Sequence, residues 1–447
     1  MASPFRLFLL TTLGFGTTFT AQAEDWPQWL GPRRDSEWRE TGIVTKFPAQ
    51  GPKVVWRKPL GPGYTGPAVA QGKVYVMDRV LPAGAKVNNS SFAPTGGPGS
   101  ERVLCYNAQN GELLWKHEYE CRYRIMYPLG PRCTPTVHQG KVYTLGAMGH
   151  LFCLNAETGK VLWQKDLPQE YKTQAPPAGY ATHPLVDGQK LICYAGGNGS
   201  TVVALDKDTG KELWKALSAP EIGYCPPVLI EHGGRRQLII WDPAQVSSLD
   251  PETGSLYWSH PFKSGMNMNI TAPRLDGDLL FVTAYFDGSL LLKLDRTKPA
   301  AEVLWKGKGG AQQRKTGMRG MMCTPYFKDG FIYGVCGNGE LRCLKAETGD
   351  RLWDTMKATR PNDRPMQWAN AFIIANGDRF FLANELGELL IAKLTPQGYE
   401  ILDRTKLLEP THAVSGRDVV WSHPAFANRC VYARNDKEIV CISLAAE

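Results

Sequence analysis

The sequence lacks the long hydrophobic run that a membrane-spanning helix requires. Its one extended apolar stretch, Leu7 to Phe19, falls short of the ~20 residues that cross a bilayer. The sequence has no C-x-x-C-H motif for an attached haem, and neither H-x-x-x-H nor C-x-x-C spacing for a metal. No Ser-His-Asp or paired-carboxylate arrangement can be assembled from spacing. Helical periodicity over ten or more residues is also absent after residue 23, so we expect an all-β protein without a metal site of the usual spacing.

Neither sign of charge is in large excess. The chain has 51 Lys and Arg against 43 Asp and Glu, a formal net charge of +8. That mild excess suits acidic partners but is far from a nucleic-acid-binding composition. We therefore expect no nucleic-acid partner.

The first 23 residues have the features of a signal peptide. Arg6 gives a basic start, Leu7 to Phe19 forms the apolar region, and Ala21-Gln22-Ala23 is a small-x-small cleavage site. Cleavage near Ala23 would leave 424 residues with a charge of +7. The sequence therefore predicts a periplasmic or secreted protein without a membrane span. No cysteine follows the cleavage site, which argues against a lipid anchor.

Eleven cysteines are present, but their placement does not indicate a disulfide framework. Two strand positions recur with cysteine in several repeats, and at one of them the other repeats carry Thr, Asn or Ser. Equivalent positions in non-adjacent repeats lie too far apart for the ~7 Å Cα limit of a bridge. We interpret most of these thiols as buried small hydrophobes. A bridge between Cys430 and Cys441, facing each other across the last hairpin, stays open as the exception.

An eleven-residue phrase recurs along the chain at intervals of about 44 to 59 residues, a period typical of propellers. Its clearest copy, Ala204 to Trp214, reads A-L-D-K-D-T-G-K-E-L-W. Asp206 can accept backbone N–H bonds across the turn, and Gly210 supplies the positive φ. The closing Trp should lie flat against the neighbouring repeat as a structural docking residue. The predicted docking residues are Trp56, Trp115, Trp163, Trp214, Trp258, Trp305 and Trp353, with Leu402 in a degenerate copy.

Each repeat contains four short β-rich runs joined by Gly, Asn and Asp turns, as in a four-stranded antiparallel blade. Eight opening strands and eight closing strands can be counted. The first closing strand precedes the first opening strand, so the strand Lys53 to Leu60 should complete the C-terminal blade. The sequence therefore predicts an all-β, eight-bladed β-propeller over residues 53–447, preceded by an N-terminal extension over 24–52.

The repeated A-x-D-x-x-T-G-x-x-x-W phrase resembles the docking motif of the pyrroloquinoline-quinone (PQQ) repeat propellers, over about residues 53–447. The segment from Asp25 to Gly42 resembles the leader of exported bacterial PQQ-like propellers. The resemblance implies two branches: quinoprotein dehydrogenases, which hold PQQ and Ca²⁺ at the ring centre, and the outer-membrane protein assembly lipoprotein, which binds protein. The chain departs from the first in having no Cys-Cys pair, no Glu, Asn and Asp set at the pore and no haem motif. It departs from the second in lacking the anchor cysteine and in its greater length.

Function is expected on one face of the ring. Loops between blades and loops joining second to third strands share a face in a four-stranded propeller, and we call this the loop face. The long insertions all fall there, at 79–101, 116–131, 164–179, 306–321, 354–367 and 403–419. Loops on a rigid scaffold commonly carry recognition.

Residues that precede each opening strand should line a central funnel on the loop face. The candidate binding residues are Tyr64, Arg132, Tyr180, Tyr224, Asn269, Arg319, Met322, Trp368 and Trp421. A ring rich in Tyr, Trp and Arg is typical of a binding hot spot or a stacking platform. The same aromatics could simply plug the funnel. Three interpretations therefore stay open: the aromatics fill the funnel, they bind a planar or anionic ligand, or they bind a partner peptide.

The sequence favours a monomeric, exported, non-catalytic binding or scaffold module, in the cell envelope or in outer-membrane protein assembly. Its partner would be an envelope protein or peptide on the loop face, or a small anionic or planar ligand, and no cofactor is expected. The alternative is a PQQ-dependent quinoprotein oxidoreductase of the alcohol or sugar dehydrogenase type, with PQQ and Ca²⁺. A second alternative is a carbohydrate-binding accessory protein.

Overall fold

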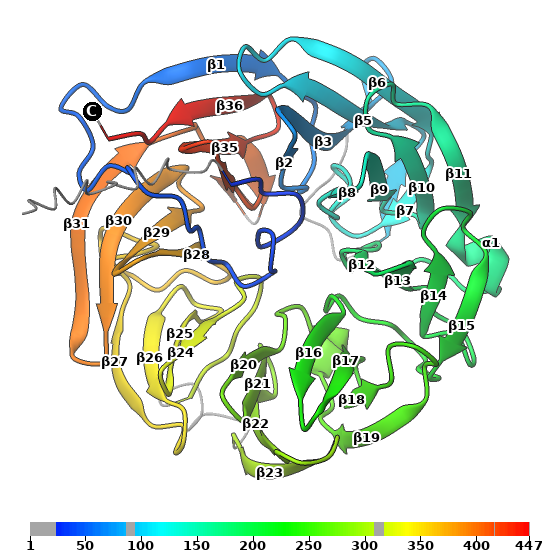
Figure 1. Cartoon of the computed structure of the whole chain (residues 1–447). Helices are drawn as coiled ribbons and strands as arrows, with labels where there is room; N and C mark the ends of the chain where they lie inside the picture. Colours follow the sequence, from blue (N-terminus) through cyan, green and yellow to red (C-terminus); the bar gives the residue numbers. More distant parts are fainter. Residues whose placement is uncertain (1–23, 86–93, 308–316, 415, 447) are drawn as a thin grey trace, which may run out of the picture.

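A computed structural model describes residues 24–85, 94–307, 317–414 and 416–446. In this part of the chain, eight four-stranded antiparallel sheets are arranged as blades around a ring (Figure 1). The prediction of an eight-bladed β-propeller is confirmed. The expected signal peptide, residues 1–23, lies outside the described residues.

The first four blades follow the chain order from the inner to the outer strand. Blade 1 has β2 (Ala68–Ala70), β3 (Lys73–Val80), β5 (Ser100–Asn107) and β6 (Leu113–Glu120). Blade 2 has β8 (Thr136–His138), β9 (Lys141–Leu145), β10 (His150–Asn155) and β11 (Val161–Asp166). Blade 3 has β12 (Leu185–Asp187), β13 (Lys190–Tyr194), β14 (Val202–Asp206) and β15 (Glu212–Ala216). Blade 4 has β16 (Val228–His232), β17 (Arg235–Trp241), β18 (Gln245–Leu249) and β19 (Leu256–Pro261).

The remaining blades repeat this order, except that the last one is completed by the start of the chain. Blade 5 has β20 (Arg274–Asp276), β21 (Leu279–Ala284), β22 (Gly288–Leu294) and β23 (Ala301–Lys306). Blade 6 has β24 (Tyr326–Lys328), β25 (Phe331–Val335), β26 (Leu341–Lys345) and β27 (Arg351–Thr355). Blade 7 has β28 (Ala371–Asn376), β29 (Arg379–Asn384), β30 (Glu388–Thr395) and β31 (Gly398–Lys406). Blade 8 has β34 (Ala425–Ala427), β35 (Cys430–Arg434), β36 (Glu438–Ser443) and β1 (Val54–Pro59).

Ring closure follows from the pairing of β1 with β36. Trp56 lies opposite Cys441, and Pro59 lies opposite Glu438. This pairing joins the two ends of the propeller and covers the edge of β36 that would otherwise be exposed. The predicted closing strand, Lys53 to Leu60, is confirmed.

The repeated phrase makes the same contacts from blade to blade. The Asp206 carboxylate accepts hydrogen bonds from the Asp208 and Thr209 amides at 3.1 and 2.8 Å, which fixes the turn. Gly210 has a φ of +73°, and a Cβ there would lie 2.8 Å from Cε3 of Trp163 in the preceding blade. Trp163 Nε1 donates to the Lys207 carbonyl at 3.0 Å. The glycine is therefore needed both for its backbone conformation and because the indole of the previous blade packs against its Cα.

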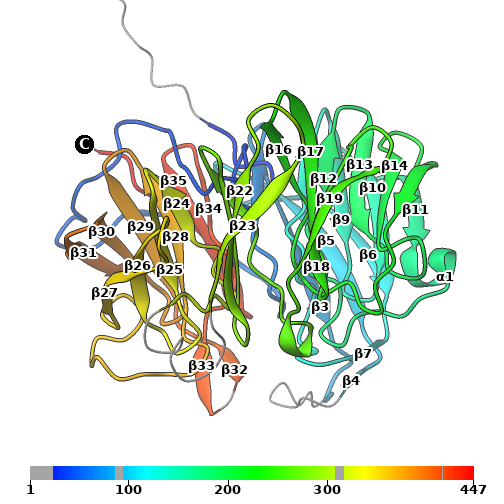
Figure 2. The same ribbon diagram turned by 90° about the horizontal axis from the view of Figure 1, so that it is seen from below.

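Loops of the loop face form two additional small sheets. β4 (Thr95–Gly97) pairs with β7 (Tyr123–Ile125), and β32 (His412–Val414) pairs with β33 (Arg417–Val419). Figure 2 shows these four strands at one end of the ring. In the described part of the chain, helix is confined to α1 (Leu167–Tyr171) and the 3₁₀ turn η1 (Gly265–Asn267), and no helix is long and apolar enough to span a membrane.

Residues 24–46 cross the opposite end of the ring, which we call the sealed end (Figures 1 and 2). Trp26 forms a β-bridge with Val69 of β2, and Glu37 forms one with Ala375 of β28. Trp26 and Trp38 are 2% and 1% exposed. The N-terminal extension is thus part of the packed core of the ring, because its tryptophans fill the space between the inner strands.

All eleven cysteines lie in the described part of the chain, and none forms a disulfide there. Cys430 is paired with Ser443, and Cys441 with Tyr432. Cys430 and Cys441 are therefore diagonal neighbours across the last hairpin, two residues apart in register, and their thiols interact without forming a bridge. Seven of the cysteines recur at two equivalent positions of the repeats, and all seven are buried, as a small side chain requires.

Candidate functional site

At the sealed end, the indole of Trp29 covers the axis of the ring. This indole stacks on the His183 imidazole, with ring centroids 4.6 Å apart and planes at 10°, and it meets the His423 ring edge-on at 5.7 Å. Arg34 donates hydrogen bonds to the His183 and Pro184 carbonyls, both at 3.1 Å. Arg274 donates to the Arg34 carbonyl at 3.0 Å, which links blades 3 and 5 through the extension.

Burial controls the charge of these groups at the axis. Burial, together with the positive charge of Arg34, holds the pKa of His183 well below its ordinary value. Its Nδ1 accepts a hydrogen bond from the Thr134 amide at 2.9 Å, which requires an unprotonated nitrogen. Burial lowers the pKa of His423 to about 3. Both histidines are therefore neutral at physiological pH, as expected of structural residues.

The candidate funnel residues lie at the other opening of the ring, which we call the open mouth, and the first group surrounds Tyr64. The Tyr64 hydroxyl lies 2.8 Å from His412 Nε2, and His412 Nδ1 lies 2.8 Å from the Asp436 carboxylate. Arg132 places its guanidinium 5.0 Å from the Tyr64 ring centroid and donates to the Met126 carbonyl at 2.8 Å. His412 therefore bridges the Tyr64 hydroxyl and the Asp436 carboxylate.

Asp436 gives the Tyr64 group a negative charge. Burial opposes ionisation, but the His412 hydrogen bond and the charges of His412 and Arg434 hold the pKa of Asp436 below its ordinary value. The carboxylate also accepts from the Gly63 amide at 3.1 Å. The Tyr64 group therefore ties blade 1 to blade 8 across the point where the chain closes the ring.

A second group surrounds the buried carboxylate of Glu385, between blades 7 and 8. Arg360 forms an ion pair with it, and Arg417 contacts its two oxygens at 3.1 and 3.2 Å. Trp421 Nε1 donates to Glu385 Oε2 at 3.0 Å. Glu385 is 0% exposed. Its charge is compensated by the two guanidinium groups, as a fully buried carboxylate requires.

Three of the funnel residues are buried and bonded to the scaffold. The Tyr180 hydroxyl donates to the Ala195 carbonyl at 2.8 Å, and the Tyr224 hydroxyl accepts from the Ala178 amide at 3.1 Å. Asn269 Nδ2 donates to the Trp241 carbonyl at 2.7 Å. These side chains fill the wall of the ring and have little surface to offer a ligand.

The last three funnel residues are half-buried and lie over blades 5 to 7. Arg319 stacks on Tyr285, with its guanidinium 4.6 Å from the ring centroid, and donates to the Tyr285 carbonyl at 2.7 Å. The Trp368 amide donates to the Gly337 carbonyl at 2.6 Å, and Trp368 has a φ of +62°. Met322 is half-buried beside them in the chain segment that enters β24. The structure therefore places the nine predicted residues in separate groups around the mouth, and it does not gather them into one pocket.

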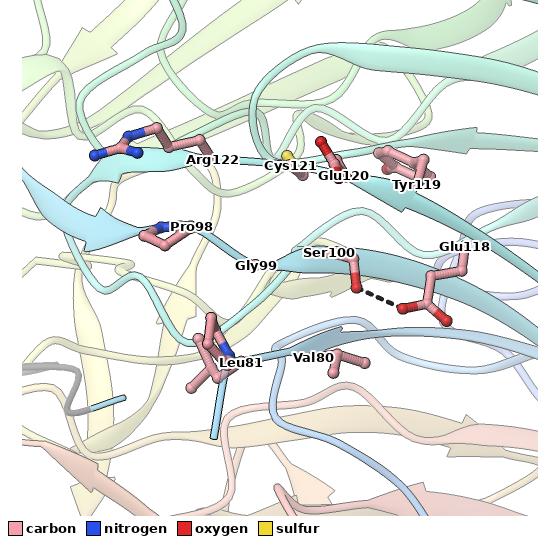
Figure 3. Close-up of a pocket in the computed structure, with 11 residues that line it drawn as sticks. Val80, Leu81, Pro98, Gly99, Ser100, Glu118, Tyr119, Glu120, Cys121 and Arg122 are labelled. Atoms are coloured by element: carbon pink, nitrogen blue, oxygen red, sulfur yellow. Dashed lines mark hydrogen bonds between the residues drawn. The ribbon is translucent and has the colours of Figure 1, made fainter. Parts of the chain in front are cut away.

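A cavity of about 690 Å³ lies away from the mouth, where β5 begins and β6 ends (Figure 3). None of the predicted funnel residues lines it. Ser100 Oγ donates to Glu118 at 2.6 Å on its wall, and Cys121 Sγ lies 3.7 Å from His150 Nδ1. Burial and the nearby Glu101 charge raise the pKa of the Cys121 thiol. The thiol is therefore protonated and is not a nucleophile at neutral pH.

Sequence reasoning missed His412 and Glu385. Neither belongs to a motif: each acts through partners that lie far away along the chain, such as Tyr64 and Arg360. Within the described ranges, no group of three His, Cys, Asp or Glu side chains is placed to hold a metal ion. Only their position along the chain could have indicated these two residues, since both fall in or beside loop-face segments of blades 7 and 8.

The sequence matches the profile of a family described as "Outer membrane protein assembly factor BamB" over residues 99–285, 199–320 and 242–447. These overlapping matches span residues 99–447, well over half of the chain. The chain belongs to this PQQ-like β-propeller family. A search of curated proteins finds no significant match to this PQQ-like propeller.

Solved structures agree with the fold. BamB from Moraxella catarrhalis has a TM-score of 0.56 at 15% identity, covering 88% of this chain and 98% of that one. Quinohemoprotein alcohol dehydrogenase from Comamonas testosteroni has a TM-score of 0.62 at 14% identity, covering 95% and 81%. The computationally designed Ika8 protein gives 0.54 at 12% identity, covering 88% and 100%. At these identities the similarity concerns the fold alone.

Proposed function

We propose that this PQQ-like propeller is an exported, monomeric, non-catalytic scaffold that binds a protein or peptide of the cell envelope through its loop face. The family description supports a role in outer-membrane protein assembly. The two ends of the ring support the choice of face, because the extension covers the ring axis at the sealed end. A partner that reaches the ring centre would have to do so from the open mouth.

The observation that carries the proposal is the state of the carboxylates at the open mouth. Both oxygens of Glu385 accept from cationic or indole donors of the chain itself. The Asp436 oxygens accept from His412 and from the Gly63 amide. Ca²⁺ beside a quinone would need several such oxygens as ligands. Glu385 and Asp436 therefore do not fit the role of Ca²⁺ ligands beside a quinone, and we derive no redox step.

The groups around the mouth also act as braces. The Glu385 group links blades 7 and 8, and the Tyr64 group links blades 8 and 1. Rigid loops held in this way present a fixed surface, which lowers the entropic cost of binding a partner. A scaffold benefits from this arrangement without any reaction at the site.

The proposal is tested by site-specific photo-crosslinking in the native cells. A benzophenone amino acid replaces Met366 on the loop face, and in a matched control it replaces Gln189, an exposed residue of a turn at the other end of the ring. We expect a protein adduct of defined mass from position 366 and none from position 189. A defined adduct from position 189 alone would contradict the choice of face. Glycan binding that is lost on Trp368→Ala would favour the carbohydrate-binding alternative.

A further inference from the structure

Large apolar side chains are exposed on one sector of the loop face. Met266 is 70% exposed, Phe286 is 41% exposed and Met366 is 37% exposed. They come from the blade 4–5 connection, the β21–β22 turn and the blade 6–7 connection. We call these three residues the apolar arc. Methionine and phenylalanine together form an adaptable surface that suits bulky apolar partners.

The arc is continuous with the half-buried funnel residues of the same sector. A Cβ on Gly265 would lie 3.1 Å from Phe286 Cβ, so the segment that carries Met266 packs beside Phe286. Phe286 meets the Tyr285 ring edge-on at 4.8 Å, and Tyr285 carries the Arg319 guanidinium.

The connection continues from Arg319 to Met366. The Arg319 carbonyl accepts from the Gly337 amide at 3.0 Å, and the Gly337 carbonyl accepts from the Trp368 amide at 2.6 Å. The Met366 amide donates to the neighbouring Asn338 carbonyl at 3.0 Å. Hydrogen bonds and ring contacts thus connect the three segments that carry the arc, over blades 5 to 7.

Positive charge predominates around the arc. Among the described residues, five cations of this sector have no carboxylate within ion-pair distance: Lys263, Lys306, Arg319, Lys357 and Arg364. Of the neighbouring acids in the described part of the chain, Asp287 and Asp363 have no cation within ion-pair distance, and the others are paired. Asp287 accepts from the Gly265 amide, Asp354 pairs with Arg351, and Glu385 pairs with Arg360 and Arg417. The sector therefore presents positive charge around an apolar centre.

We propose that the apolar arc docks an acidic polypeptide segment that inserts bulky apolar side chains between Met266, Phe286 and Met366. The cations around the arc would meet carboxylates on either side of the anchor residues. Apolar anchors surrounded by complementary charge are the usual composition of a binding hot spot. This inference rests on the proposed function and specifies its partner and its sector.

The test uses a random dodecapeptide library displayed on phage, selected against the full mature chain. We expect the enriched peptides to combine an aromatic, Leu or Met anchor with Asp or Glu. The dissociation constant of a fluorescein-labelled enriched peptide is then measured by anisotropy. The double variant Met266→Ser/Phe286→Ser should weaken binding at least tenfold. Leu256→Ser is the matched control, since Leu256 is 54% exposed on the outer strand of blade 4, and it should change the affinity less than twofold.

Charge is tested on the same peptide. Replacing its acidic residues by Asn and Gln should weaken binding several-fold, and binding to the original peptide should weaken as NaCl increases. Enrichment of basic or uncharged peptides, or an affinity that the double variant leaves unchanged, would overturn the proposal. Retention on phosphatidylserine vesicles in place of peptide would also overturn it.

The location of binding separates this inference from the proposed function. If the double variant has no effect but Arg124→Glu, on the exposed face of β7, abolishes binding, the arc is wrong and the loop-face scaffold stands. If no peptide is enriched, or if binding is blocked only by a substitution at Gln189, both proposals fail.

Discussion

The two ends of the ring are built from similar residues that are used in different ways. At the sealed end, Trp26, Trp29 and Trp38 are at most 5% exposed, and they pack against the inner strands. At the open mouth, Trp368 and Trp421 are half-buried and held by hydrogen bonds, and Met366 and Phe286 are exposed. The sealed end therefore buries its aromatic side chains, whereas the open mouth leaves apolar surface exposed. The predictions below test this division.

The largest effect is expected for Trp38→Ala at the sealed end. Trp38 is 1% exposed, contacts Phe381 and Phe426, and donates from Nε1 to Glu40 at 2.8 Å. Truncation would leave a large cavity and remove one of the three hydrogen-bond donors to the buried Glu40 carboxylate, which should cost ~3–5 kcal/mol in the free energy of unfolding. Denaturant melting measures this loss. A cost under ~1 kcal/mol would mean that the extension is not part of the core.

At the open mouth, the brace around Glu385 should matter for stability more than any exposed residue there. Glu385→Gln keeps the shape but removes the charge that compensates Arg360 and Arg417, and should cost ~3 kcal/mol. The measurement is again the free energy of unfolding, with Arg364→Gln as a control that should change it little. If Glu385→Gln instead stabilises the protein, the carboxylate is kept for a ligand and the account of the mouth is wrong.

The histidines of the sealed end predict a dependence of stability on pH. The folded pKa of His423 is about 3, and that of His183 is well below its ordinary value, whereas an unfolded histidine titrates near 6.5. The unfolded chain therefore binds more protons below about pH 6.5, so stability is complete above that pH and falls as the pH decreases. Each histidine should contribute a slope of ~1.4 kcal/mol per pH unit between about pH 6 and 4. His423→Gln should remove one such slope in melts at several pH values, and an unchanged slope would contradict its burial as a neutral group.

The smallest effect on stability is expected in the apolar arc. Met366→Ser should change the free energy of unfolding by less than ~0.5 kcal/mol, because an exposed side chain loses little packing. The same denaturant melts provide the measurement. A loss above ~2 kcal/mol would show that the arc is a part of the core and is not a free surface.

The fold could be predicted because its determinants are local and repeated. Asp206, Gly210 and Trp214 act within eleven residues, and copies of the phrase occur around the ring, so one copy explains the others. The path of the extension could not be predicted, since Trp29 and Trp38 follow no period and pack on residues more than a hundred positions away along the chain.

The open mouth was predictable only in part. Position along each repeat placed Tyr64, Arg319 and Trp421 at the mouth. Their partners could not be found in this way, because the hydrogen bond between Tyr64 and His412 joins residues 348 positions apart, and Glu385 binds arginines from two other segments. Side chains that join different blades leave no pattern within one blade.

The central claim is that the open mouth binds a polypeptide and no quinone. It is tested most directly by titrating the purified mature protein with PQQ, with and without Ca²⁺, and following heat and the visible absorbance of the quinone. The account predicts no saturable binding in either condition. Saturable binding at micromolar concentration or below, weakened by Arg132→Ala or Tyr224→Ala, would contradict it and favour a quinoprotein oxidoreductase.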